Sequence, residues 1–410
     1  MNRTAMRPLS FSRDQNNTRT LFGVGLLLGM TVGAWAGARA RDFARSYTTP
    51  RLIDWERVRQ LAIQANARER LNGEERARLT AAYRELVERA APLVASYTGD
   101  SIPAAVERVY AFDRVDWIDA NLEGFAALLR PIEELVSLPD HPALRLGALA
   151  WIQAGQVLAT TEVGIMLGFL ARRVLGQYDL VLLGREPITT GRLYFVEPNV
   201  RWVERQLGVH PVDFRFWLAL HEVTHAFEFE AHPWLRDYLN DRIVRLVTSL
   251  YAEGQLMQRL QQGLRAVPLL FGRGDDTQAF IESLLSTEQR ELFQQVQAVM
   301  AVIEGYGNHV MNAVGRETIP SYAEIARRFE QRQQQRTPAE QLFIRLIGLD
   351  VKLEQYRLGE QFADAIIQRY GRDVFRRIWE GPALLPTLDE LRHPDDWARR
   401  VTGRVGEPTA

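Results

Sequence analysis

A short pattern in this sequence combines residue types that can carry out chemistry: His221, Glu222 and His225, in the order H-E-x-x-H. Residues four apart on an α-helix lie one turn apart on the same side, so the two imidazoles would face the same way. Zn²⁺ is commonly held by such a pair, and a catalytic zinc keeps one coordination position for water. We therefore predict a zinc site, with Glu222 beside it as the general base.

The residues around this pattern predict the helix that must carry it. Pro211 suits a first helical turn, Asp213 places a negative charge near the helix N-terminus, and Pro233 ends the run. Residues 214–232 are rich in large apolar side chains, as expected for a buried helix. The alternative interpretation is a helix whose two histidines only form hydrogen bonds in the core.

Two histidines do not complete a zinc site, and the candidates for a third ligand are Glu228, His232, Glu304 and His309. Glu228 lies far along the zinc helix and is better placed to contact a ligand than the metal. His232 does not have the spacing of a third histidine ligand. Glu304 ends the apolar stripe of a later helix, where a cation would offset the cost of burying a carboxylate. An ion pair with an arginine is the alternative for Glu304.

The residues that follow Glu304 extend the predicted site. Gly305 and Gly307 carry no side-chain bulk, which would let the end of their helix approach the zinc helix closely. Tyr306 and His309 could donate hydrogen bonds to the oxyanion that develops during hydrolysis. We therefore predict both as catalytic residues.

Composition limits the classes of function. The 410 residues allow one large domain or two ordinary ones, with a substantial core. Lys and Arg number 50 and Asp and Glu 51, for a net charge of -1, so nothing in the overall charge favours nucleic acid as a partner. Cysteine is absent, so a metal must be held by His, Asp or Glu.

The N-terminal residues predict a membrane anchor. Residues 1–19 are polar and expected to be disordered, residues 20–38 carry no charge and are long enough to span a bilayer, and residues 39–51 form a linker. A cleaved signal peptide and a glycine-rich helix packed on the soluble domain are the alternatives for residues 20–38. We expect a membrane-associated protein with its catalytic domain in the cytoplasm; a soluble cytoplasmic protein is the alternative.

Glycines recur every four residues within the predicted anchor, at Gly25, Gly29, Gly33 and Gly37. A stripe of small residues on one face lets two helices pack closely in lipid. The spacing therefore indicates that the protein could form a homodimer through this segment.

The remaining chain predicts a mainly α-helical fold, with a single multi-helix domain over residues 52–402 and a tail over 403–410. Apolar residues recur at three- and four-residue spacing from residue 52 onward, including residues 109–136. Residues 179–183 and 193–200 predict two short strands, in a small hairpin or sheet. Leu193 to Val196 could be an edge strand along which an extended substrate pairs, or part of a hairpin that only caps the helices.

The chain resembles a zincin-like metallopeptidase family that is named for the association of its genes with coenzyme biosynthesis. The matching stretches are DRVDWIDAN (113–121), LGQYD (175–179), WLALHEVTHAFEF (217–229), PWL (233–235), EGYGNHVMNAVG (304–315), LDVKLEQYRLGEQF (349–362) and LPTLDELRHPDDW (385–397). The resemblance implies one largely helical domain and a zincin-type active site, with Glu304 as third ligand. Two residues depart from the family pattern: Glu228, where relatives often carry an amide, and Tyr306, where they often carry His.

Together these observations predict a zinc-dependent metallopeptidase that acts on a peptide or amide substrate, with Glu222 activating water. One alternative is a zinc-stabilised binding or assembly module without catalytic activity. Another is an amidohydrolase acting on a non-peptide substrate of coenzyme metabolism, which only the resemblance suggests.

Overall fold

The structure is a computed structural model that describes residues 52–134, 142–178, 191–252, 285–334 and 349–403. The chain divides into two compact units, residues 1–51 with 136–155 and residues 52–135 with 156–410. Of the first unit, only residues 142–155 are described. The site and the elements around it belong to the second unit.

The described chain is mainly helical, which confirms the predicted fold class. In chain order its elements are α2 (Trp55–Asn66), α3 (Gly73–Thr98), η1 (Ala104–Glu107), β1 (Val109–Phe112), α4 (Arg114–Glu134), α5 (Pro142–Leu170), β2 (Gly176–Tyr178), β3 (Leu193–Val196), α6 (Glu197–Leu207), α7 (Pro211–Ala231), α8 (Pro233–Ala252), α11 (Thr287–Thr318), α12 (Tyr322–Gln334), α14 (Leu349–Tyr370), α15 (Arg372–Arg376), η3 (Arg377–Glu380), η4 (Pro382–Leu384), α16 (Leu388–Arg392) and α17 (Pro394–Thr402).

A small three-stranded sheet has the order β1-β3-β2. β3 pairs in parallel with β1 and antiparallel with β2. The prediction that Leu193 to Val196 is an edge strand was therefore wrong, because β3 is the central strand. The other predicted strand, residues 179–183, lies outside the described residues.

β3 is central because both of its faces are buried. Leu193 and Phe195 point into the larger hydrophobic core, around α3, α7, α11 and α14. Tyr194 and Val196 point into a second core, formed with α2, α4 and α5. Alternate residues of a strand face opposite sides of a sheet, so a strand with both faces buried is a continuous apolar run.

The strand β1 was missed in the sequence, where residues 109–136 were predicted to be helical throughout. Its four residues, VYAF, lie just before α4. Their apolar residues run on into the apolar positions of α4. A segment of four residues is too short to distinguish the two-residue period of a strand from the 3.6-residue period of a helix. Pairing with β3, more than 80 residues away in the sequence, is what makes this segment a strand.

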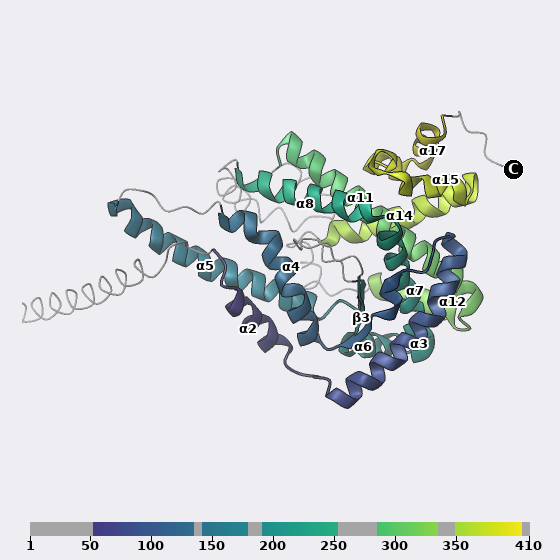
Figure 1. Ribbon diagram of the computed structural model, residues 1–410, viewed down its shortest axis with the longest axis horizontal. Helices are drawn as coiled ribbons and strands as arrows, with labels where there is room; N and C mark the ends of the chain where they lie inside the picture. The colour runs from purple at the N-terminus through teal and green to yellow at the C-terminus, as the bar shows by residue number, and fades with distance from the viewer. Residues whose placement is uncertain (1–51, 135–141, 179–190, 253–284, 335–348, 404–410) are drawn as a thin grey trace, which may run out of the picture. The chain divides into compact units, whose positions relative to one another are not determined.

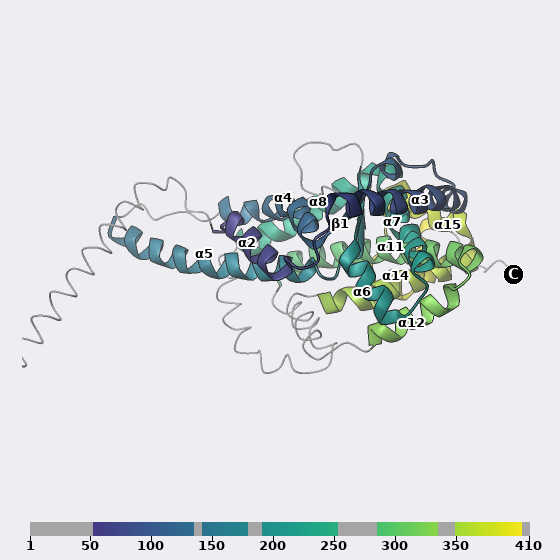
Figure 2. The same cartoon turned by 90° about the horizontal axis from the view of Figure 1, so that it is seen from below.

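α7 runs through the middle of the larger core, between α3 and α11 (Figures 1 and 2). Most of its residues between Phe214 and Phe229 are buried. A helix with apolar residues on all sides must be covered on all sides, as α7 is. Polar residues on such a helix are costly unless they have partners, so its histidines and glutamates call for a functional explanation.

α11 packs against α7 on one side and against α14 on another. A capping box formed by Ser286 and Gln289 fixes its N-terminus. The helix starts at Thr287 and continues to Thr318, so the prediction that it ends near Glu304 was wrong. Glu304 is therefore held by a continuous helix and not by a helix end.

α11 and α14 cross at a pair of glycines. A Cβ atom added to Gly359 would lie 1.8 Å from the carbonyl oxygen of Ala301, and one added to Gly305 would lie 2.2 Å from the carbonyl carbon of Gly359. Both clashes are with backbone, which cannot rotate away. Only glycine permits the two helices to approach this closely.

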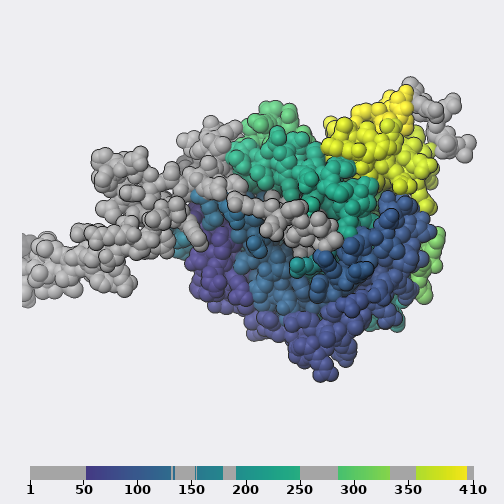
Figure 3. Space-filling model, viewed as in Figure 1, coloured from purple at the N-terminus to yellow at the C-terminus, as the bar shows by residue number. Residues whose placement is uncertain are grey.

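The predicted anchor, residues 20–38, lies outside the described residues, as does its glycine stripe. Within the described residues, none of the helices combines the length and apolar character needed to cross a membrane. On the face of the second unit shown in Figure 3, α3 (blue) adjoins the C-terminal elements (yellow).

Candidate metal centre

α7 begins at Pro211, and His210 is its N-cap residue. The side chain of Asp213 accepts hydrogen bonds from the backbone N–H and the hydroxyl of Ser321, at 3.3 and 2.6 Å, which ties this first turn to the start of α12. Regular helix from this point brings His221 and His225 to the same side, as their spacing predicted.

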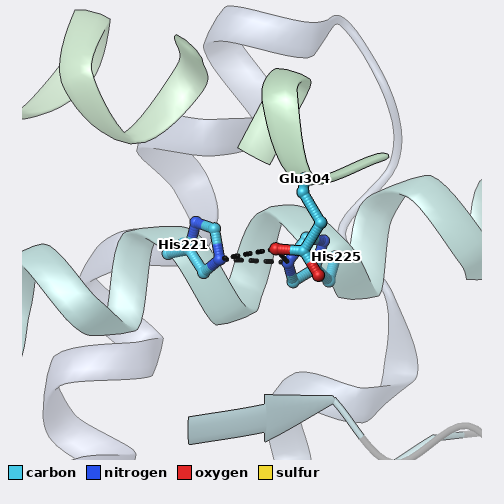
Figure 4. A group of neighbouring side chains, drawn as sticks. All are labelled: His221, His225 and Glu304. Atoms are coloured by element: carbon cyan, nitrogen blue, oxygen red, sulfur yellow. Dashed lines mark hydrogen bonds and ion pairs between the residues drawn. The ribbon is translucent and has the colours of Figure 1, made fainter. Parts of the chain in front are cut away.

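Glu304 of α11 meets the two histidines of α7 (Figure 4). The Nε2 atoms of His221 and His225 are 3.1 Å apart. Oε2 of Glu304 lies 3.7 Å from Nε2 of His221 and 3.8 Å from Nε2 of His225. The structure therefore brings together the three residues that were predicted as ligands.

This arrangement fits a zinc ion. Zinc bonds of about 2.0–2.2 Å in a tetrahedron place neighbouring donor atoms about 3.3–3.5 Å apart. The observed separations of 3.1, 3.7 and 3.8 Å bracket this value. The Nε2 atoms of His221 and His225 converge on one carboxylate oxygen of Glu304, which is unfavourable unless a proton or a cation lies between them.

Gly307 provides the space that the imidazoles occupy. A Cβ atom at this position would lie 3.0 Å from Cε1 of His225 and 3.2 Å from Cε1 of His221. The prediction that a glycine lets α11 approach α7 closely is confirmed for Gly307. It was wrong for Gly305, which faces α14.

The side chain of Glu222 projects from α7 against the strand β2. A Cβ atom added to Gly176 would lie 2.6 Å from Oε1 of Glu222, so the strand passes directly over this carboxylate. The backbone N–H of Tyr178 donates a hydrogen bond to it. Burial raises the pKa of Glu222, while the neighbouring His221 and His225 oppose the rise.

Glu228 contacts the far side of His225. The Nδ1–H of His225 donates to Oε2 of Glu228 at 2.7 Å, which leaves Nε2 of His225 to face Glu304. Burial raises the pKa of Glu228 to about 7. Burial also opposes charge on His225, yet the carboxylates of Glu228, Glu304 and Glu222 raise its pKa to about 9. The sequence predicts that Glu228 contacts a metal ligand and not the metal, and in the structure it contacts His225.

Comparison with known proteins agrees with this geometry. Residues 53–398 match the zincin-like metallopeptidase family. This chain belongs to that family. Among solved structures, it is similar to the crystal structure of a "putative hydrolase with a novel fold" from Chloroflexus aurantiacus, with 39% sequence identity, 86% of this chain and 99% of that chain covered, and a TM-score of 0.63. A search of curated proteins finds no match.

In this zincin-like protein, Tyr306 and His309 lie on α11 but turn away from the metal-facing side. His309 is five residues beyond Glu304, a rotation of about 140° around the helix axis. Its two ring nitrogens contact Asp364 and Tyr97. The ring of Tyr306 stacks on Phe375, with centroids 4.8 Å apart. Their role in stabilising an oxyanion stays a prediction.

His232, the residue set aside as a third ligand, is the C-cap of α7. Its ring stacks in parallel on Trp379, with centroids 5.2 Å apart. Burial lowers the pKa of His232. The structure thus gives His232 an aromatic partner away from the three converging side chains.

Residues that support the zincin-like site were missed in the sequence. Gly176 and Tyr178 of β2 contact Glu222, and Tyr97 and Asp364 contact His309. LGQYD and LDVKLEQYRLGEQF, which carried the resemblance, contain Gly176, Tyr178 and Gly359. These motifs could therefore have pointed to Gly176, Tyr178 and Gly359, but Tyr97 and Asp364 lie outside the matching stretches. Nothing in the spacing shows what any of these residues contacts.

Proposed function

We propose that this chain is a zinc-dependent hydrolase that cleaves peptide or amide bonds. The observation that carries the proposal is the meeting of His221, His225 and Glu304 with a fourth group, Glu222, next to the histidines and outside the ligand set. The three predicted ligands are partly accessible, with side-chain exposures of 15%, 11% and 23%. Solvent can therefore reach them.

Each residue would have a distinct task. His221, His225 and Glu304 would hold the zinc, which when bound supplies Lewis acidity towards a carbonyl group and towards water. Glu222 would take a proton from the attacking water and pass it to the leaving amine. In the metal-free site, burial raises the pKa of Glu222, so its carboxylate is a better proton acceptor than that of an exposed glutamate.

Within the described residues, β2 pairs with a strand on one side only. It also lies against Glu222. We propose β2, in place of β3, as the strand along which an extended peptide would pair, because backbone pairing there would bring a scissile bond close to the general base. Protection of the β2 amides from hydrogen exchange by a bound peptide mimic would support this; unchanged exchange would refute it.

The substitution Glu222→Gln tests the proposal. It keeps the shape of the side chain but removes the base, so the variant should bind zinc as tightly as the wild type while hydrolysis falls by about 100-fold or more. Glu204→Gln is a matched control, because Glu204 is also a buried carboxylate and pairs with Arg215 of the same helix α7 at 2.6 Å, not with the histidines. The control should retain most activity.

Turnover of peptides and of small amides should be measured side by side, together with bound zinc. Full activity in Glu222→Gln would refute its assignment as the base. Wild-type protein that binds zinc but hydrolyses neither substrate class would favour the binding or assembly module. Turnover of small amides alone would favour the amidohydrolase.

A further inference from the structure

His309 is a buried histidine whose ring is held on both sides. Its Nδ1 lies 2.5 Å from Oδ1 of Asp364, and its Nε2 lies 2.6 Å from the hydroxyl of Tyr97. The residue is 8% exposed. Neither nitrogen is left over for a substrate in this arrangement, so His309 calls for a role other than contact with the reacting groups.

The partners of His309 define the role of its Nδ1 atom. An ionised carboxylate can only accept, so Nδ1–H donates to Asp364. Nε2 forms a hydrogen bond with the hydroxyl of Tyr97, which can donate or accept. The result is one continuous chain of hydrogen bonds, from Tyr97 through His309 to Asp364.

This chain joins three helices at one point. Tyr97 belongs to α3, His309 to α11 and Asp364 to α14. Glu360, one turn before Asp364, accepts a hydrogen bond from Asn312 of α11 at 2.7 Å. Along α11, His309 lies only about 7.5 Å from Glu304.

The glycine crossing and the hydrogen-bonded chain constrain α11 in different ways. Contact between Gly305 and Gly359 sets how close α11 and α14 lie, but smooth backbone surfaces without side chains can still rotate against each other. Directional hydrogen bonds from His309 to two other helices oppose that rotation. Because Glu304 projects from the same helix, its direction depends on the angle at which α11 is held.

We propose that His309 is a positioning residue for the metal centre. By linking Tyr97 and Asp364, it fixes the rotation of α11 so that Glu304 faces His221 and His225. This inference rests on the proposed function, since it assumes that Glu304 is the third ligand. It replaces direct contact with an oxyanion as the role of His309.

The test uses the full chain and compares Tyr97→Phe, His309→Ala and His309→Asn. Zinc affinity is measured by competition with a chelator, and the Co²⁺ form by its visible absorption, which reports the ligand geometry. Tyr97→Phe and His309→Ala should weaken zinc binding by about tenfold, the lower end of the range for residues that support a ligand. They should also alter the Co²⁺ spectrum. His309→Asn keeps a donor for Asp364 and should recover part of the affinity.

Tyr83→Phe is the matched control. Tyr83 lies on the same helix α3, and its hydroxyl donates to Glu197 of α6 at 2.7 Å. This variant should lower thermal stability but leave zinc affinity and the Co²⁺ spectrum unchanged. If Tyr97→Phe and His309→Ala behave in the same way, their role is only structural and the positioning proposal is overturned.

A second readout needs no metal. The ¹⁵N chemical shifts of His309 in the metal-free protein should show a proton on Nδ1, and Asp364→Asn should change them. An Nδ1 without a proton, or shifts that Asp364→Asn leaves unchanged, would overturn the proposal. Failure of the wild-type protein to bind zinc or Co²⁺ at all would instead refute the proposed function, and with it the role assigned to His309.

Discussion

The two helices that form the candidate metal centre obtain their geometry in different ways. α7 supplies His221 and His225, and also Glu228, which contacts His225. These positions follow from helical periodicity within a few residues. α11 supplies only Glu304, whose place depends on glycines that meet α7 and α14. One side of the site is thus built locally and the other by tertiary packing, so the two sides should respond differently to substitution.

The largest effect is expected from Gly359→Ala, which disturbs only the α11 side. Its Cβ atom would lie 1.8 Å from the carbonyl oxygen of Ala301, so the two helices must separate. We expect a loss of about 3 kcal/mol or more in the free energy of unfolding, measured by chemical denaturation. Zinc affinity of the remaining folded protein should also fall, because Glu304 moves with α11.

Gly124→Ala is the control for this substitution. Gly124 also lies within a helix, α4, and a Cβ atom there would meet nothing within 4 Å. Alanine favours helix over glycine, so this variant should be as stable as the wild type or more stable by about 0.5–1 kcal/mol. Equal stability of the two variants would show that the crossing of α11 and α14 is not tightly packed.

A smaller effect is expected from Glu228→Gln, which disturbs only the α7 side. The charged acceptor for Nδ1–H of His225 is lost, but an amide oxygen can still accept a hydrogen bond. Zinc affinity, measured by chelator competition near pH 9, should fall by about tenfold. Stability should change much less than in Gly359→Ala. A loss of zinc binding as complete as that expected from removing a ligand would mean that Glu228 itself binds the metal.

The smallest effect on stability and on zinc affinity is expected from a change of one pH unit. The folded pKa of His225, about 9, is above its ordinary value of 6.5. In the metal-free protein its contribution to stability is therefore complete below pH 6.5 and lost as the pH rises through 9. Zinc must displace the proton on Nε2 of His225. Zinc affinity should therefore increase with pH over the same interval, by no more than about tenfold per pH unit.

Thermal unfolding of the metal-free protein and chelator competition across this interval check both trends. Glu228→Gln should shift the point at which zinc affinity stops rising to lower pH, because it removes the carboxylate that raises the pKa of His225 most. A zinc affinity that does not vary with pH in the wild type would contradict the assignment of His225 as a ligand.

The sheet shows where sequence patterns were insufficient. The sequence pattern predicts helix for Val109–Phe112 and an edge strand for Leu193–Val196. In the structure the two segments pair as neighbouring strands, and β3 is central. Strands of four residues carry too few positions to establish a period, and pairing partners far apart in the sequence leave no local signal. The long helices α7 and α11 were found because each repeats its pattern over many turns.

The amino-acid sequence by itself determined α7, its two histidines, the adjacent Glu222 and the mainly helical fold, because each follows from periodicity within single helices. It also singled out Glu304, through the apolar stripe on its own helix. Only the tertiary structure decided that Glu304 meets the histidines, that β2 covers Glu222 and that His309 joins three helices. The physical reason is that helical periodicity repeats every 3.6 residues and is visible locally, whereas contacts between distant segments depend on how whole helices pack.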